Sequence, residues 1–421
     1  MMDLFSLPDF TMPEGFLWGS GYAGHQVEGN NVHAGHWHRE QLGHFPEKSG
    51  MACNSYALWE TDVRLAEATG LQAFRTSVEW SRIEPQEGCF EAGAAEHYVR
   101  LFAALKERGL RVFATAVHFS CPQWFEEKGG FSDPANLRYF ERYLQYIVPR
   151  IAPYVDFWNV LNEFNLGMSE DAIRFKLSCV RFHALGYHVI RQYSDRPISS
   201  AHALVQYVPK RGADEWDQTM AHYLDLCSHE FFFHAIRTGE LLFPFRDGEY
   251  LPEVKGTADF WSVNTYVRDM IDARKASAFG TRYPFARMKM LHRDFYLEEI
   301  NPECVVHNLS RLTDRPIYIT ENGCSCHDDR FRIAWLALYL SAVREAIALG
   351  ADVRGYLYWS LLDNYEWGSF EPTFGLYAVD RTTFERMPKP SASFYREVID
   401  QNGVSQELLR RYLTENPSLA L

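Results

Sequence analysis

The chain has 421 residues, of which 47% are apolar and 15% aromatic, and its formal net charge is −13. This length accommodates one large α/β barrel or two ordinary domains, and the composition is that of a globular protein. The negative charge argues against nucleic acid or an anionic membrane surface as a partner. The chain contains no run of roughly 18 apolar residues, so we expect no membrane span.

The start of the chain and its cysteines favour a cytoplasmic location. Residues 1–9 have neither a basic start nor a long apolar run, so we expect no secretory signal. The eight cysteines are scattered, which favours free thiols in a reducing compartment. Cys324 and Cys326 are too close in sequence for a relaxed disulfide and do not form a C-x-x-C motif. We therefore expect them to be loop thiols.

Strand-like and helical segments alternate along the chain. The apolar runs that predict strands are 16–22, 72–78, 111–117, 156–161, 197–203, 259–264, 316–320 and 354–360. The periodic segments that predict helices are 54–69, 94–108, 133–150, 169–193, 214–237 and 329–349. Eight strands with intervening helices predict a single (β/α)8 TIM barrel of the α/β class over residues 1–421. A doubly wound sheet is the alternative, but no glycine-rich phosphate loop follows any strand.

Two of these strands end in a glutamate. One apolar run leads into Glu321, followed by Asn322 and Gly323, and another leads into Asn162 and Glu163. A carboxylate at the mouth of an apolar strand is costly to place and usually serves a site. Two such carboxylates are the arrangement that glycosidic bond cleavage requires.

Further polar and aromatic side chains follow the other strands. In a barrel these positions converge at the C-terminal face, and the irregular segments 23–52, 119–132, 266–300 and 361–393 are candidate loops around it. The candidate residues are Gln26, Arg75, His118, Asn162, Glu163, Asn264, Tyr266, Glu321, Trp359, Glu366 and Trp367. Several of these residues have an alternative structural role. Arg75 would form an ordinary buried ion pair, and His118 would be a core histidine. The tryptophans, together with Trp124, would pack in the core.

Seven motifs together resemble glycoside hydrolase family 1, the β-glucosidase and β-galactosidase group, and the resemblance covers essentially the whole chain. Each motif alone is moderate evidence, but all of them occur in the family order. They are Phe16-Leu17-Trp18-Gly19 with Gln26-Val27-Glu28-Gly29, residues 74–83 (FRTSVEWSRI), residues 118–124 (HFSCPQW), Asn162-Glu163, Asn264-Thr265-Tyr266, residues 319–323 (ITENG) and residues 359–367 (WSLLDNYEW).

The resemblance implies a retaining exo-β-glycosidase with Glu321 as nucleophile and Glu163 as acid/base. Arg75, Asn162, Asn264 and Tyr266 would support the two carboxyls, and Asn162 would also bind the 2-hydroxyl of the sugar. The substrate-binding residues would be Gln26, His118, Asn162, Trp359, Glu366, Trp367 and Phe374. The substrate would be a small β-glycoside with a terminal glucosyl residue, or a galactosyl or fucosyl residue. The family needs no metal or organic cofactor, and we expect none.

The chain departs from the family pattern at three positions. Phe164 replaces the usual proline after the acid/base glutamate, Thr265 replaces an aromatic residue, and Thr373 replaces a basic residue before Phe374. Glu366 favours a free sugar over a phosphorylated one. The histidines within 33–44 fit no common zinc spacing, so we expect no metal there.

Three alternatives remain open from the sequence. A β-galactosidase or β-mannosidase would share most of the sugar-holding residues. A non-catalytic sugar-binding barrel would usually lack one of the two glutamates, and this chain has both. A metabolic barrel enzyme that binds phosphate at its last two strand loops is disfavoured by the acidic, aromatic loop around Glu366.

Overall fold

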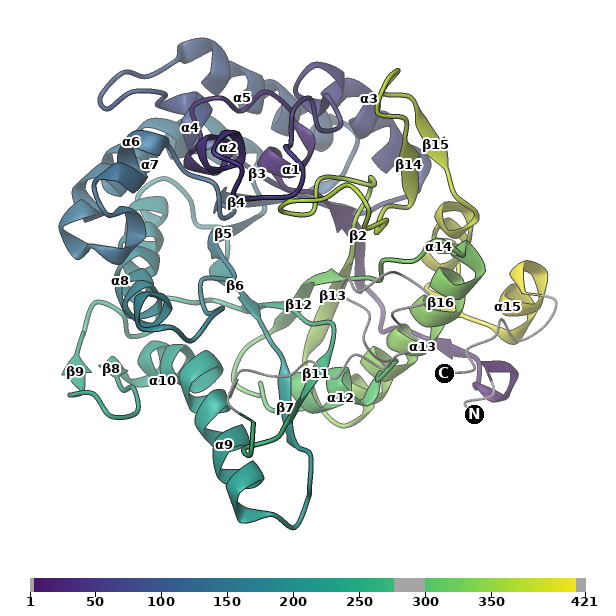
Figure 1. The fold of residues 1–421 in the computed structure, drawn as a ribbon. Helices are drawn as coiled ribbons and strands as arrows, with labels where there is room; N and C mark the ends of the chain where they lie inside the picture. Colours follow the sequence, from purple (N-terminus) through teal and green to yellow (C-terminus); the bar gives the residue numbers. More distant parts are fainter. Residues whose placement is uncertain (1–3, 276–299, 414–421) are drawn as a thin grey trace.

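A closed barrel of eight parallel strands forms the centre of the molecule in the computed structural model, which describes residues 4–275 and 300–413 (Figure 1). Around the ring, each strand pairs with the next, and the last pairs with the first. In that order the strands are β2 (Leu17–Gly21), β3 (Ala73–Ser77), β4 (Arg111–Val117), β5 (Phe157–Asn162), β6 (Ile198–Ala203), β10 (Trp261–Asn264), β12 (Ile317–Asn322) and β13 (Val353–Trp359). The predicted (β/α)8 barrel and all eight of its strands are confirmed.

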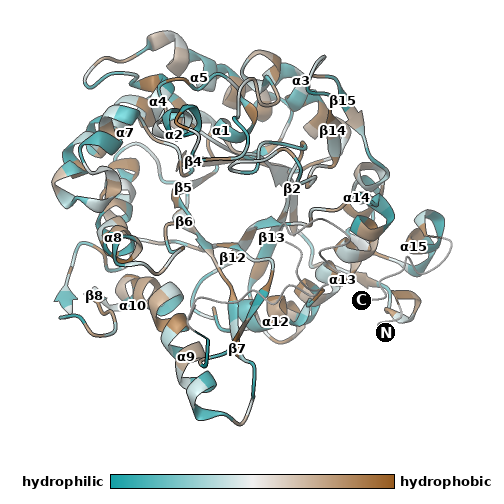
Figure 2. Ribbon diagram, viewed as in Figure 1, coloured by the Kyte–Doolittle hydropathy of each residue, from teal (hydrophilic) through white to brown (hydrophobic). Residues whose placement is uncertain are grey.

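Helices surround the barrel, and Figure 2 shows hydrophobic and hydrophilic stretches side by side on them, for example on α8 and α14. The helices are α1 (Gly24–Val27), α2 (Gly35–Gln41), α3 (Ser55–Ala68), α4 (Trp80–Ile83), α5 (Ala92–Glu107), α6 (Gln123–Glu127), α7 (Leu137–Ile151), α8 (Glu170–Arg191), α9 (Glu215–Asp225), α10 (Phe231–Thr238), α12 (Glu303–Ser310), α13 (Asp329–Ala348), α14 (Pro390–Asp400) and α15 (Gln406–Tyr412). Such two-sided helices bury one face against the strands.

Small two-stranded sheets lie outside the barrel. They pair β1 (Phe10–Thr11) with β16 (Gly403–Val404), β7 (Gln206–Pro209) with β11 (Arg268–Ile271), β8 (Glu240–Leu241) with β9 (Glu249–Tyr250), and β14 (Tyr377–Val379) with β15 (Arg386–Pro388). The β1–β16 pair joins the two ends of the described chain, and Trp18 donates a 2.8 Å hydrogen bond to Asn402 across the same seam.

The predicted helices differ from the observed ones in detail. The segment predicted as helix over 214–237 is α9 and α10 joined by a π-helical turn at Leu226–Glu230. The side chain of Asp133 accepts a 2.9 Å hydrogen bond from the backbone of Ala135 and so caps the 3-10 turn before α7, as Asp-Pro predicts.

The segments expected to be loops contain ordered elements. Residues 23–52 contain α1 and α2, and residues 119–132 contain α6. Residues 361–393 contain β14, β15 and the start of α14. The segment 266–300 contains β11, and its part from 276 to 299 lies outside the described residues.

The barrel interior is divided into an apolar lower layer and a polar upper layer. Ala73, Phe113 and Leu357 belong to one buried apolar cluster inside the barrel, where the rings of Phe113 and Phe157 stack with centroids 4.2 Å apart. Side chains alternate along a strand, so the next inward residues lie two positions later and nearer the C-terminal face. On β3 that position is Arg75. The apolar layer therefore forms a floor, and the charged groups lie above it.

Candidate active site

Glu321 lies at the C-terminal end of β12 and is 5% exposed. The guanidinium of Arg75 forms an ion pair with Glu321 Oε1. The hydroxyl of Tyr266 donates a 2.9 Å hydrogen bond to Oε2. Both carboxylate oxygens therefore have a donor, as an ionised carboxylate requires when it is buried. A side chain at Gly323 would collide with the backbone carbonyl of Trp359, so only glycine lets the two strand ends come this close.

Glu163 directly follows β5 and has a left-handed backbone (φ 48°), which is uncommon for a residue other than glycine. Asn264 Nδ2 donates a 2.9 Å hydrogen bond to Glu163 Oε1. Although the residue as a whole is half-buried, burial of its carboxyl raises the pKa of Glu163 to about 8, with the negative charge of Glu321 as the second cause. Glu163 therefore carries a proton at neutral pH.

Asn162 links the two glutamates through their neighbours. Its Oδ1 accepts hydrogen bonds from Arg75 (2.6 Å) and from Asn264 (3.1 Å). Its Nδ2 lies 3.1 Å from Nε2 of His118. Burial, with the charge of Arg75, holds the pKa of His118 well below its usual range, so the ring is neutral and can accept this hydrogen bond. The network fixes the orientation of Asn162 before any ligand enters.

Gln26 and Glu366 form a second polar group on the opposite side of the barrel mouth. Gln26 Nε2 donates to Glu366 Oε2 (3.1 Å), and the Trp359 ring nitrogen donates to Glu366 Oε1 (3.1 Å). Burial raises the pKa of Glu366 to about 7. Gln26 Oε1 is buried without a hydrogen-bond partner among the described residues, so it offers a preformed acceptor to a ligand hydroxyl.

Aromatic rings line the same side. The His118 ring is stacked between Trp359 and Trp367, with centroid separations of 5.9 Å to each and interplanar angles of 14° and 11°. Phe374 packs with Trp359 in a small apolar cluster, against which Tyr266 also packs. Flat aromatic faces next to fixed polar groups suit a ligand that is apolar on one face and hydroxylated at its rim.

These residues surround one pocket of about 650 Å³, a volume that includes its part open to solvent. Ten of the predicted site residues line it: Gln26, His118, Glu163, Asn264, Tyr266, Glu321, Trp359, Glu366, Trp367 and Phe374. Arg75 and Asn162 are not part of this lining. Arg75 binds Glu321, and Asn162 accepts hydrogen bonds from Arg75 and from Asn264, the residue that binds Glu163. The structure therefore brings all twelve predicted residues into one connected site.

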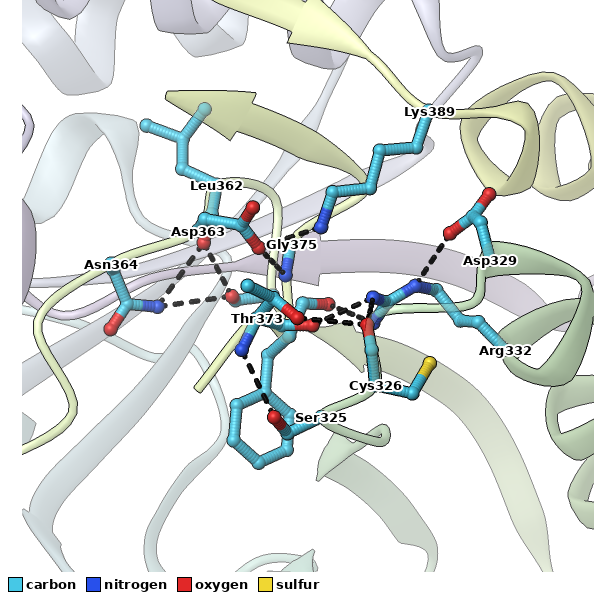
Figure 3. Close-up of polar contacts among 12 residues, drawn as sticks. Ser325, Cys326, Asp329, Arg332, Leu362, Asp363, Asn364, Thr373, Gly375 and Lys389 are labelled. Atoms are coloured by element: carbon cyan, nitrogen blue, oxygen red, sulfur yellow. Dashed lines mark hydrogen bonds and ion pairs between the residues drawn. The ribbon is translucent and has the colours of Figure 1, made fainter. Parts of the chain in front are cut away.

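The loops after β12 and β13 are fastened to each other by Arg332 of α13, which is fully buried (Figure 3). Its guanidinium donates to the backbone carbonyls of Cys324 (2.6 Å), Cys326 (2.9 Å), Thr373 (2.6 Å) and Phe374 (3.0 Å). Asp329 accepts a 2.8 Å hydrogen bond from the same side chain. One cation therefore holds the segment after Glu321 against the segment that carries Phe374.

A second attachment lies beside the first in Figure 3. The carboxylate of Asp363 accepts hydrogen bonds from Lys389 and from the backbone of Gly375, both at 2.8 Å. The side chain of Asn364, one residue later, donates to Ser360 (3.0 Å), and its oxygen accepts from Gln26 (3.0 Å). These contacts fix the loop between Trp359 and Glu366.

Comparison with known proteins agrees with this geometry. The family model described as Glycosyl hydrolase family 1 matches residues 9–404. The chain belongs to glycosyl hydrolase family 1. It is therefore an O-glycoside hydrolase, as its motifs indicate.

The similar family 1 proteins match over nearly their whole length. The chain is 28% identical to Beta-glucosidase A of Thermotoga maritima, over 93% of this chain and 98% of the relative. It is 26% identical to a Beta-galactosidase of Pyrococcus woesei, over 94% and 99%. Among solved structures, a beta-glycosidase from Pyrococcus horikoshii superposes with a TM-score of 0.85 at 31% identity, covering 98% of this chain and 100% of that one.

The three departures from the family 1 pattern each take part in local packing. Phe164 is buried and packs edge-on against Phe232 of α10, with ring centroids 5.0 Å apart. The Thr265 hydroxyl accepts a 3.0 Å hydrogen bond from Asn308, and the Thr373 hydroxyl donates a 2.8 Å hydrogen bond to the carbonyl of Cys326. These residues therefore fasten the loops on which the site depends.

The pocket also contains residues that the motifs did not identify. They are Phe119, Leu166, Ala203, Leu204, Val205 and Val267. Ala203 ends β6, and Phe119, Leu204, Val205 and Val267 lie within three residues of the end of β4, β6 or β10, so position after a strand is a signal that could have found them. Trp124 lies outside the pocket and packs against Trp80 and Tyr139, which is a core role.

One group of possible metal ligands occurs among the described residues, formed by His25, His36 and Glu40. His25 Nδ1 faces the amide nitrogen of Asn31 at 3.2 Å, and His36 Nδ1 faces the guanidinium of Arg39 at 3.2 Å. These donors favour a proton on Nε2 of both rings, which leaves no lone pair there for a metal. His25 Nε2 lies 3.0 Å from Glu40 Oε1 and hydrogen-bonds to it, whereas His36 Nε2 lies 4.0 Å from the same oxygen.

Proposed function

We propose that the chain is a retaining exo-β-glycosidase that removes terminal β-D-glucosyl residues from small glycosides, with Glu321 as nucleophile and Glu163 as acid/base. The observation that carries this proposal is the contrast between the two carboxyls. Glu321 is held by a cation and a hydroxyl, and Glu163 has a pKa of about 8. One is therefore suited to attack and the other to donate a proton.

The reaction proceeds in two displacements. A carboxylate oxygen of Glu321 attacks the anomeric carbon while the proton of Glu163 moves to the glycosidic oxygen, so that the C–O bond breaks and the alcohol leaves. The ester formed on Glu321 has no negative charge, so the pKa of Glu163 falls and it becomes a base. It then takes a proton from water, whose oxygen attacks the anomeric carbon and releases the sugar with its original configuration.

The remaining residues bind the sugar. Asn162 holds the 2-hydroxyl, Gln26, His118 and Glu366 hold the other hydroxyls, and Trp359 stacks on the ring. Trp367 and Phe374 complete the wall. The relatives include both beta-glucosidases and beta-galactosidases, so galactosyl and fucosyl residues are further glycones to test. No helix among the described residues is long and apolar enough to cross a membrane.

We further infer that the enzyme works in the cytoplasm as a single catalytic domain over residues 1–421. All eight cysteines are free, including the buried pair Cys324 and Cys326, whose sulfurs are 3.9 Å apart and thus not bonded. Free thiols throughout a chain of this size suit a reducing compartment.

The test is an assay on p-nitrophenyl β-glucoside, β-galactoside, β-mannoside, β-fucoside and 6-phospho-β-glucoside. Turnover of one or more neutral sugars supports the proposal and ranks the glycones. Turnover of the phosphorylated sugar alone would contradict the role of Glu366, and no turnover at all would favour a sugar-binding barrel.

Two variants then test the roles of the glutamates. Glu321→Ala should abolish turnover. Glu163→Ala should slow alkyl glycosides at least a hundredfold more than 2,4-dinitrophenyl glycosides, because only a poor leaving group needs a proton, and general acid catalysis is worth about 10² to 10⁴ in rate. Equal losses on both substrates would contradict the acid role.

A further inference from the structure

One side of the pocket carries most of its aliphatic residues. They come from the end of β6 and from the loops that follow β5, β6 and β10, which are neighbours in the barrel order. The polar residues Glu163, Asn264 and Tyr266 come from the ends of β5 and β10 and lie among them in sequence. We call this side the aliphatic wall, and its members are Leu166, Ala203, Leu204, Val205 and Val267.

The aliphatic wall lies on the side of the pocket that contains Glu163. Leu166 is three residues after Glu163 on the same loop and is 44% exposed. Val205 is half-buried, and Val267 is 8% exposed. The proton of the acid/base goes to the oxygen of the leaving group, so the group beyond that oxygen meets this wall.

The backbone at Ala203, Leu204 and Val205 is already committed to hydrogen bonds. The N–H and carbonyl of Ala203 pair with the side chain of Asn165, at 3.1 and 2.8 Å. The carbonyl of Leu204 accepts from Asn308 (2.9 Å), and that of Val205 pairs with His229 (2.9 Å). These groups are therefore not available to a ligand, and the side chains beside them have no polar atoms.

A second sugar placed against the wall would lose water from its hydroxyl groups without gaining partners, which is unfavourable. An alkyl chain or an aromatic ring would instead remove its own apolar surface and that of the wall from water. Such burial is favourable by an amount that corresponds to about a fourfold gain in binding for each methylene.

We propose that the aliphatic wall is the leaving-group subsite and that it selects glycosides of alkyl or aryl alcohols over disaccharides. This inference rests on the proposed function, because it needs Glu163 to protonate the leaving oxygen. Selection is expressed in kcat/KM, since the wall contacts the leaving group before and during bond cleavage.

The experiment measures glucose release from methyl, ethyl, n-butyl and n-hexyl β-D-glucosides and from cellobiose. The straight-chain alcohols have nearly equal acidities, so chain length changes contact and not leaving-group chemistry. If another sugar ranks first in the p-nitrophenyl panel, its glycosides are used. We expect kcat/KM to rise by about threefold to fourfold per carbon over the first few carbons, and cellobiose to lie below n-butyl glucoside.

Variants separate the wall from general effects on the protein. Leu166→Asn and Val205→Thr should flatten the chain-length series and raise cellobiose relative to n-hexyl glucoside. The matched control is Leu242→Asn, because Leu242 is similarly exposed (48%) and does not line the pocket. It should leave the series unchanged.

The possible failures are distinguishable. A wild-type enzyme that hydrolyses p-nitrophenyl and methyl glucosides but shows a flat series, or prefers cellobiose to every alkyl glucoside, overturns the subsite and leaves the proposed function intact. A protein inactive on all glycosides overturns both. A rising series that neither Leu166→Asn nor Val205→Thr changes shows that the wall is not its cause and also overturns the inference.

Discussion

Replacing Glu321 by glutamine should lower the pKa of Glu163 by about two pH units. The substitution removes one negative charge and keeps the shape of the side chain. Burial and the charge of Glu321 are the two largest causes that raise the pKa of Glu163 to about 8, in that order. After the substitution, burial still raises the pKa, while the charge of Arg75 is no longer balanced and lowers it further.

The magnitude follows from Coulomb's law. Two carboxylates about 5–5.5 Å apart, the separation of a retaining pair, repel each other by about 3 kcal/mol at an effective dielectric constant of roughly 20. Because about 1.36 kcal/mol corresponds to one pH unit, this repulsion is worth about two units. The proton of Glu163 is retained below its pKa, so the substitution moves the loss of that proton to lower pH.

The assay is difference infrared spectroscopy of the protonated carboxyl band. Spectra of the wild type are compared with Glu163→Gln, and spectra of Glu321→Gln with the double variant, across a pH series. The subtraction isolates Glu163 from other buried acids such as Glu366, whose pKa is about 7. An unchanged or higher midpoint in Glu321→Gln would refute the reasoning, since burial alone would then set the pKa of Glu163.

Two further predictions concern the groups that hold the site. Tyr266→Phe removes the 2.9 Å hydrogen bond to Glu321, which as a bond to a charged group is worth about 1.5–3 kcal/mol. In steady-state assays the substitution should lower kcat about tenfold to hundredfold, while the melting temperature stays near that of the wild type. An unchanged kcat would contradict the contact. Arg332→Met leaves buried carbonyls without donors, so it should reduce the free energy of unfolding in urea by about 3–5 kcal/mol and raise KM. Arg330→Met, on the exposed face of the same helix, should reduce the free energy of unfolding by less than about 1 kcal/mol. Equal effects of the two substitutions would refute the fastening role of Arg332.

The barrel was predictable because its strands are buried on both faces and read as continuous apolar runs between helical segments. The catalytic pair was predictable for a related reason. Glu321 and Glu163 are charged residues at the ends of such apolar runs. The resemblance to the family then indicated the residues that bind the two carboxyls and the sugar. Whether a residue follows a strand is a local property of the chain, so it can be predicted from the sequence alone.

The rest depends on contacts between distant segments. Nothing near Arg332 in the sequence indicates that its guanidinium reaches residues 324, 326, 373 and 374. The π-helical turn at Leu226–Glu230 has no periodic signal of its own, since one extra residue merely shifts the helical stripe. The aliphatic wall was missed because Leu204 and Val205 look like ordinary core residues until the barrel closes.

The contacts of Arg332 also bear on how the surrounding sequence can change. Four of its acceptors are backbone carbonyls, which every amino acid possesses. The side chains at positions 324 and 326 therefore take no part in this attachment, whereas the hydroxyl of Thr373 adds a 2.8 Å hydrogen bond of its own to the carbonyl of Cys326. Substitutions of similar size at positions 324 and 326 should therefore leave the course of both loops unchanged, because a single arginine preserves it.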